Sequence, residues 1–178
     1  VANFRIIERE HRIFIDQLSR QAEGITHDFL LIRRMNMKTS ARNQFLGKVA
    51  GVRKGAVNDE IELEVTGGHK IIAIVTHEST DGLGLKVGTE AFALIKASSI
   101  IVVTEDQDAK FSARNRLNGK VSRLQPGAVN AEVTIELPGG GAIAAIVTHE
   151  SCKTLGLVIG KPASAIFKAS SVIVGVPA

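Results

Sequence analysis

A set of hydrogen-bonding side chains occurs twice in this sequence at a constant separation. Ser40-Ala41-Arg42-Asn43 returns 72 residues later as Ser112-Ala113-Arg114-Asn115. Two more elements, Thr-His-Glu-Ser and Lys-Ala-Ser-Ser, repeat with the same offset. Self-similarity at a fixed period indicates a repeated architecture, and this period is too long for one solenoid unit. The sequence therefore predicts two tandem copies of one small domain.

Each copy collects one guanidinium, one ammonium and three hydroxyl groups, with an alanine small enough to expose its own N–H. The first set is Ser40, Ala41, Arg42, Thr76, Ser79 and Lys96, and the second is Ser112, Ala113, Arg114, Thr148, Ser151 and Lys168. Arg and Lys can only donate hydrogen bonds, and charged donors form the stronger ones. Such a set suits a tetrahedral oxyanion. The alternative is that Ser-Ala-Arg-Asn only begins a strand and that Lys96 is a solvated surface lysine.

Catalytic and metal-binding interpretations are weaker. His77 and Glu78 resemble part of a metal-binding helix motif, but position 81 is Asp rather than the second His. If the two residues lie in a strand, their side chains point to opposite faces. Cys152 is the only cysteine, so we expect no intrachain disulfide and interpret it as a small buried side chain. The sequence therefore predicts no enzyme, no catalytic residues and no direct ligands for a metal cation.

Short strands joined by glycine-rich turns are expected to position the donors. In the first copy, the predicted strands cover 44–52, 60–65, 70–76, 90–95 and 99–103. Gly67-Gly68 and Gly139-Gly140 indicate hairpin turns. A single helical turn is predicted over 79–83, with Ser79 as its N-cap. Five strands and one helical turn predict a mainly β fold, with each copy an OB-like, partly open five-stranded barrel.

The predicted domains are a helical segment over 1–37, a first barrel over 38–105 and a second over 110–178. Apolar residues recur at helical spacing along 3–22. This amphipathic helix either packs on its own domain or pairs with its copy in a second chain. A short helix or a strand over 29–34 follows. Because domains near 70 residues are marginal alone, we expect the barrels to pack side by side or on another chain.

The composition agrees with a cytoplasmic protein that has an anionic partner. The net charge is +4, which favours an anion. Lys and Arg are scattered and aromatic residues are few, which counts against a nucleic-acid surface in this chain. No apolar run is long enough to span a membrane, and no signal peptide is visible.

Three elements of the sequence resemble the molybdenum-pterin-binding (Mop) domain, also called TOBE. They are Ser-Ala-Arg-Asn-Gln at 40–44, the following Gly-Lys-Val at 47–49 and the Lys-Ala element at 96–97. Two such domains behind a helical segment resemble the effector half of molybdate-dependent transcriptional regulators of the ModE type. The resemblance implies tandem oxyanion-binding barrels over 38–178. It also implies that a DNA-binding winged helix precedes Val1, so that contact with DNA lies outside this chain.

The resemblance implies molybdate or tungstate bound at the interface of a homodimer. Ser40, Ala41 and Arg42 of one chain would meet the partner's Thr76, the partner's Ser79 and the partner's Lys96. The second copy keeps an equivalent set, with Arg116 in place of Gln44 and Pro126 in place of Lys54. A molybdate-sensing module of a transcriptional regulator is the function predicted. The alternatives are a cytoplasmic molybdate-storage protein of tandem Mop domains and the regulatory tail of a molybdate transporter ATPase.

Overall fold

The computed structural model describes residues 38–105 and 109–177. The helix predicted over 3–22 and the short helix or strand predicted over 29–34 lie outside these residues. Residues from Thr39 onward form one compact unit that contains both sequence repeats. Within the described ranges, no helix is long and apolar enough to cross a membrane.

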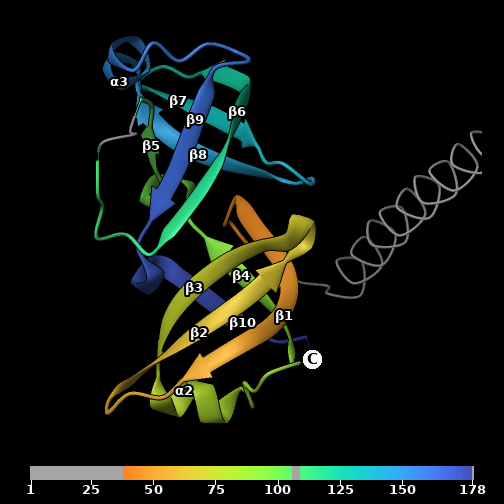
Figure 1. Cartoon of the computed structure of the whole chain (residues 1–178). Coiled ribbons are helices and arrows are strands. Elements are labelled where there is room, and N and C mark those ends of the chain that lie inside the picture. The colour runs from red at the N-terminus through yellow and green to blue at the C-terminus, as the bar shows by residue number, and fades with distance from the viewer. Residues whose placement is uncertain (1–37, 106–108, 178) are drawn as a thin grey trace, which may run out of the picture. The chain divides into compact units, whose positions relative to one another are not determined.

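The fold is mainly β, as predicted (Figure 1). The first repeat contains β1 (Asn43–Arg53), β2 (Asn58–Val65), β3 (His69–Thr76), β4 (Glu90–Ile95) and β5 (Ile101–Val103). The second contains β6 (Asn115–Pro126), β7 (Asn130–Glu136), β8 (Ala142–Thr148), β9 (Pro162–Phe167) and β10 (Val172–Gly175). Short helices α2 (His77–Gly82) and α3 (His149–Thr154) follow β3 and β8, and single 3-10 turns η1 (Thr66–Gly68), η2 (Ala97–Ser99) and η3 (Ala169–Ser171) link strands.

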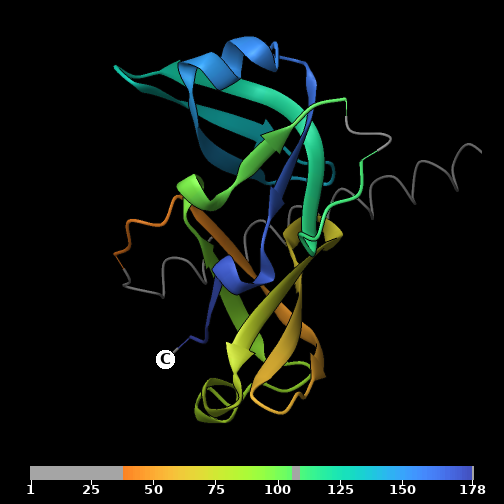
Figure 2. The same cartoon turned by 90° about the vertical axis from the view of Figure 1, so that its left-hand side faces the viewer.

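The two repeats exchange their last strands. One antiparallel sheet has the order β10-β4-β1-β2-β3, and the other has the order β5-β9-β6-β7-β8. Figure 1 shows the blue strand β10 beside the green β4, at the edge of the sheet whose other strands are yellow and orange, and Figure 2 shows the green β5 in the teal and blue sheet. Each sheet therefore takes four strands from one repeat and one from the other. This exchange was not predicted. The domains predicted over 38–105 and 110–178 describe the repeats of the sequence, and their boundaries stay a prediction.

Alternating side chains of the strands fill the core. Ile61, Leu63, Ile71 and Ala73 are fully buried in the first sheet. Their equivalents in the second repeat, Val133, Ile135, Ile143 and Ala145, are at most 1% exposed. The exchanged strands contribute to the same interior, because Val102 of β5 and Val174 of β10 are 4% and 7% exposed. The exchange thus makes the core of each sheet depend on the other repeat.

The glycine of the Gly-Lys-Val element is required by strand packing. A Cβ atom on Gly47 or Gly119 would lie 2.1 Å from the carbonyl oxygen of Glu64 or Glu136 on the neighbouring strand. No side chain fits at that separation, so only glycine allows β1 and β6 to approach their partners so closely.

The helical turn after β3 differs from its prediction. It begins at His77 rather than at Ser79, and its N-cap is Thr76, whose hydroxyl accepts from the Ser79 N–H. His77 and Glu78 therefore lie on a helix and not in a strand, because the side chain of Thr76 satisfies a free N–H of the first turn. The start of β5 also differs, since Ser99 lies in η2. The two predicted hairpin turns are present between β2 and β3 and between β7 and β8.

Candidate functional site

Each Ser-Ala-Arg-Asn segment leads into a long strand, β1 or β6, and its exposed part precedes a buried asparagine. Ser40 and Arg42 are exposed, and Ala41 is half-buried. The Ala41 N–H, expected to face an anion, donates to Thr39 Oγ1 at 3.1 Å. Ser112, Ala113 and Arg114 show the same pattern of exposure in the second repeat. The two segments thus present their serine and arginine side chains to solvent.

The asparagine of each segment fastens it to the other repeat. Asn43 is 3% exposed, donates to the Ala144 carbonyl at 2.9 Å and accepts from the Ala144 N–H at 2.7 Å. Asn115 forms the same pair of bonds with the Ile72 N–H and carbonyl, both at 2.7 Å. The amide side chain mimics a strand's backbone and satisfies edge groups of β8 and β3. We therefore assign these asparagines a structural role and not that of oxyanion donors.

The arginine of each segment reaches a glutamate of the other repeat. Arg42 Nη1 lies 3.1 Å from Glu132 Oε2. Arg114 grips Glu60 with both terminal nitrogens, at 2.9 Å and 3.0 Å. The two glutamates occupy equivalent positions 72 residues apart on β2 and β7. Both arginines are thereby held beside the opposite repeat while remaining more than half exposed.

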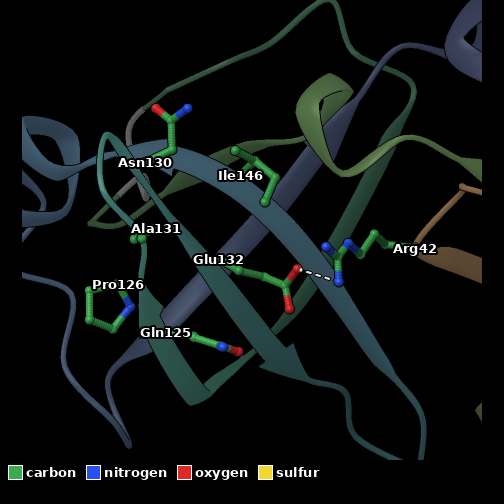
Figure 3. A pocket seen from close by; sticks show the side chains of 8 residues that line it. Arg42, Gln125, Pro126, Asn130, Ala131, Glu132 and Ile146 are labelled. Atoms are coloured by element: carbon green, nitrogen blue, oxygen red, sulfur yellow. Dashed lines mark ion pairs between the residues drawn. The ribbon is translucent and has the colours of Figure 1, made fainter.

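Arg42 contributes to a pocket of about 250 Å3 whose other lining residues come from the second repeat (Figure 3). Figure 3 shows the dashed ion pair between Arg42 and Glu132. Glu132 pairs across the sheet with Ile146, and Asn130 pairs with Thr148. Ile146 and Thr148 share one face of β8, since alternate residues of a strand do so. The first segment is therefore placed towards the Thr148 end of β8.

The Thr and Ser donors of each repeat are preorganised. Thr76 and Ser79 share a hydrogen bond between their hydroxyl groups at 2.8 Å, and Ser79 N–H donates to Thr76 Oγ1 at 3.1 Å. Thr148 and Ser151 repeat this geometry at 2.9 Å and 3.1 Å. Thr76, Ser79 and Thr148 are exposed. Two neighbouring hydroxyls at a helix start can thus be offered to a ligand together.

Each lysine lies beside the arginine of its own repeat. Ile95 pairs with Asn43, so Lys96 follows at the same end of the sheet as Arg42. Phe167 pairs with Asn115 and places Lys168 beside Arg114 in the same way. Thr76 lies at the other end of the sheet, opposite Asn58. Within one chain, Lys96 therefore lies at the same end of the sheet as Arg42, and Thr76 lies at the opposite end. How two chains combine these residues in a site stays a prediction.

The TOBE domain family matches two segments of the chain, residues 39–102 and 112–174. The chain belongs to this family. The two matched segments of the TOBE protein correspond to the repeats that exchange strands, and each contains one complete donor set.

Its relatives include proteins named for molybdenum. "Molybdenum transport protein ModE" from Azotobacter vinelandii is 42% identical over 99% of this chain and 67% of its own length. "Molybdenum-pterin-binding protein MopA" from Rhodobacter capsulatus is 43% identical over 80% of this chain and 54% of its own. The chain thus spans between about half and two thirds of these two relatives.

Among solved structures, the TOBE chain resembles the cytoplasmic molybdate-binding protein ModG in a form with molybdate bound. The TM-score is 0.77 and the identity 48%, over 79% of this chain and 100% of that one. The two chains are therefore similar in sequence as well as in fold.

The first repeat carries a buried acid that the second lacks. Asp59 is fully buried, accepts from the Gly55 N–H at 3.1 Å and bonds His77 Nδ1 through both oxygens at 3.1 Å. The hydrogen bond from His77, with smaller contributions from Thr80 and Gly55 against the cost of burial, lowers the pKa of Asp59 to about 2. In the second repeat, alanine and Cys152 replace Asp59 and Thr80. Burial raises the pKa of the Cys152 thiol, and its burial was predicted.

Sequence reasoning missed the glutamates that hold the arginines. Glu60 and Glu132 repeat at the same offset as the donors, so the signal was present. A carboxylate repels an anion, so the chemistry of an oxyanion site does not point to these two residues. The partner of each arginine lies in the other repeat, which no local pattern indicates.

Proposed function

We propose that this chain binds molybdate or tungstate and serves as the oxyanion-sensing module of a transcriptional regulator. One observation carries the proposal: the chain is 48% identical to a molybdate-binding protein solved with molybdate bound, and both its repeats keep the full donor set. A set that combines a guanidinium, an ammonium and paired hydroxyls can replace the solvation that a dianion loses on binding.

The proposed site is completed by a second chain. Ser40, Ala41, Arg42 and Lys96 lie at one end of the first OB-like barrel, and Thr76 lies at the other end of the same sheet. No single repeat can therefore gather the whole set. The family resemblance supplies the missing hydroxyls from the partner's Thr76 and the partner's Ser79, in a homodimer assisted by the helical segment predicted from the sequence over 1–37. Ser112, Ala113, Arg114, Thr148, Ser151 and Lys168 form the corresponding second site.

Thr148 and Ser151 of the same chain are the other source of hydroxyls for Arg42. They follow Ile146, which pairs with the residue that Arg42 contacts. This alternative predicts two independent sites within each chain. The shared-site proposal instead requires two chains for each site, and mixed dimers distinguish the two.

A storage protein is the second candidate function. The observation that favours it is that all of the ModG chain, described as a cytoplasmic molybdate-binding protein, is covered by this chain. The sensor is favoured by the relatives named ModE, one of which, from Yersinia pestis, is named a transcriptional regulator. A winged helix encoded upstream of Val1 supports the sensor, and a nucleotide-binding domain there supports a transporter tail. Both candidates are binding proteins without catalysis.

Molybdate is expected to stabilise the folded chain against heat. A ligand present at about 100 times its dissociation constant adds roughly 2.7 kcal/mol per site to the free energy of unfolding, because it binds only the folded state. Thermal unfolding by calorimetry, with and without molybdate or tungstate, checks this. Sulfate and phosphate at equal concentration serve as controls for ionic strength. An unchanged midpoint at millimolar molybdate and tungstate contradicts the ligand assignment.

A further inference from the structure

Both arginines assigned to the oxyanion are already engaged by a carboxylate of the opposite repeat. Arg42 contacts Glu132 at 3.1 Å, and Arg114 contacts Glu60 at 2.9 Å. The carboxylates are mostly enclosed, with 18% and 17% of their side chains exposed. They are also fixed on strands, whereas the arginines are 62% and 55% exposed. The arginine can therefore move towards a ligand more easily than the glutamate can move away.

A dianion and a carboxylate compete for one guanidinium. If the oxyanion takes the terminal nitrogens of Arg42, Glu132 loses its hydrogen-bond partner and remains close to two further negative charges. Like charges at short range oppose binding, and they do so more strongly where water is partly excluded. A partly buried carboxylate that loses its hydrogen-bond partner adds a smaller cost. Both effects weaken binding of any anion at this arginine.

We propose that Glu132 and Glu60 set the affinity for the oxyanion by competing with it for Arg42 and Arg114. This inference rests on the proposed function. It assigns the glutamates a role in keeping binding reversible, since the arginine returns to its glutamate when the ligand leaves. The two glutamates act on the ligand only through the arginines.

The competition is unequal in the two repeats. Arg53 lies 3.8 Å from Glu60 and gives that glutamate a second cation. The equivalent of Arg53 in the second repeat is Gln125, which lines the pocket of Arg42 and carries no charge. Glu60 therefore keeps a neighbouring cation when Arg114 turns to a ligand, whereas Glu132 has no such substitute at this position. The penalty is larger at Glu132.

The test is the affinity for sodium molybdate of the Glu132→Gln variant of the full chain, measured by calorimetric titration. Glutamine keeps the shape and can still accept a hydrogen bond, but it removes the competing charge. Binding is expected to tighten about tenfold, which corresponds to about 1.4 kcal/mol. The gain is expected to shrink at high salt, because screening weakens the charge effect. Glu60→Gln is expected to show a smaller gain.

Glu136→Gln is the matched control. Glu136 lies on the same strand, is exposed, and loses the same charge on substitution. The affinity of the Glu136→Gln variant for molybdate is expected to stay within about twofold of that of the parent chain. Equal or weaker binding by a folded Glu132→Gln variant overturns the inference, as does an equal gain in Glu136→Gln. If the parent itself binds no molybdate, the proposed function fails, and this inference fails with it.

Discussion

Replacing Val174 with aspartate is expected to unfold the sheet of the first repeat, although Val174 belongs to the second. Val174 pairs with Ala93 of β4 and is 7% exposed. A carboxylate there enters the core that β1 to β4 share with β10. Burying an unpaired charge of this kind costs about 3 kcal/mol or more. Hydrogen exchange is expected to show lost protection over residues 43–95 before any loss over 115–167.

The control for this experiment is Ile173→Asp on the same strand. Ile173 points outward and is 64% exposed, so a charge there should remain hydrated and change stability by less than about 0.5 kcal/mol. Loss of protection confined to the second repeat would mean that β10 pairs within its own repeat. That outcome contradicts the strand exchange.

Arg42→Ala and Lys96→Ala are each expected to weaken molybdate binding at the first site by about 30-fold to several thousand-fold. Removing one partner of a desolvated charged hydrogen-bond pair typically costs about 2–5 kcal/mol. Arginine can grip two oxygens and stays charged at any working pH, and lysine adds a second positive charge. Calorimetric titration of each variant measures the loss.

Stability without ligand separates this effect from damage to the fold. The ion pair between Arg42 and Glu132 is largely exposed on the arginine side, so its loss should cost only about 0–1 kcal/mol. Lys54→Ala is the control for binding, because Lys54 is 61% exposed and its ion pair with Asp81, at 3.6 Å, lies outside the proposed donor set. If Arg42→Ala binds molybdate within about threefold of the parent, Ser40-Ala41-Arg42-Asn43 only begins a strand.

The local elements could be predicted because their signals are local. The five strands of the first repeat are alternating or continuous apolar segments, and each was found near its predicted position. The N-cap was placed at Ser79 instead of Thr76, because both hydroxyl residues suit a cap and only the backbone decides between them. The mainly β fold followed from these elements together.

The strand exchange could not be predicted from the same signals. Residues 98–103 and 170–175 read Ser-Ser-Ile-Ile-Val-Val and Ser-Ser-Val-Ile-Val-Gly, so either segment suits either sheet. Asn43 bonds to Ala144, which lies 101 residues away in the sequence. This hydrogen bond can form only once both sheets are in place. The donors themselves were recognisable by type and by repetition. Their grouping was not, because the position of Lys96 beside Arg42 depends on the pairing of β1 with β4.

The most direct test of the account is complementation between two defective chains in one dimer. Arg42→Ala removes one half of the proposed first site and Thr76→Val removes the other. Heterodimers isolated through two different tags are expected to regain tight molybdate binding, because one of their two first sites combines intact halves. Heterodimers of Arg42→Ala with Lys96→Ala are expected to regain none, since both defects then lie in the same half. Failure of the Arg42→Ala and Thr76→Val pair to bind more molybdate than either variant alone contradicts a site shared between subunits.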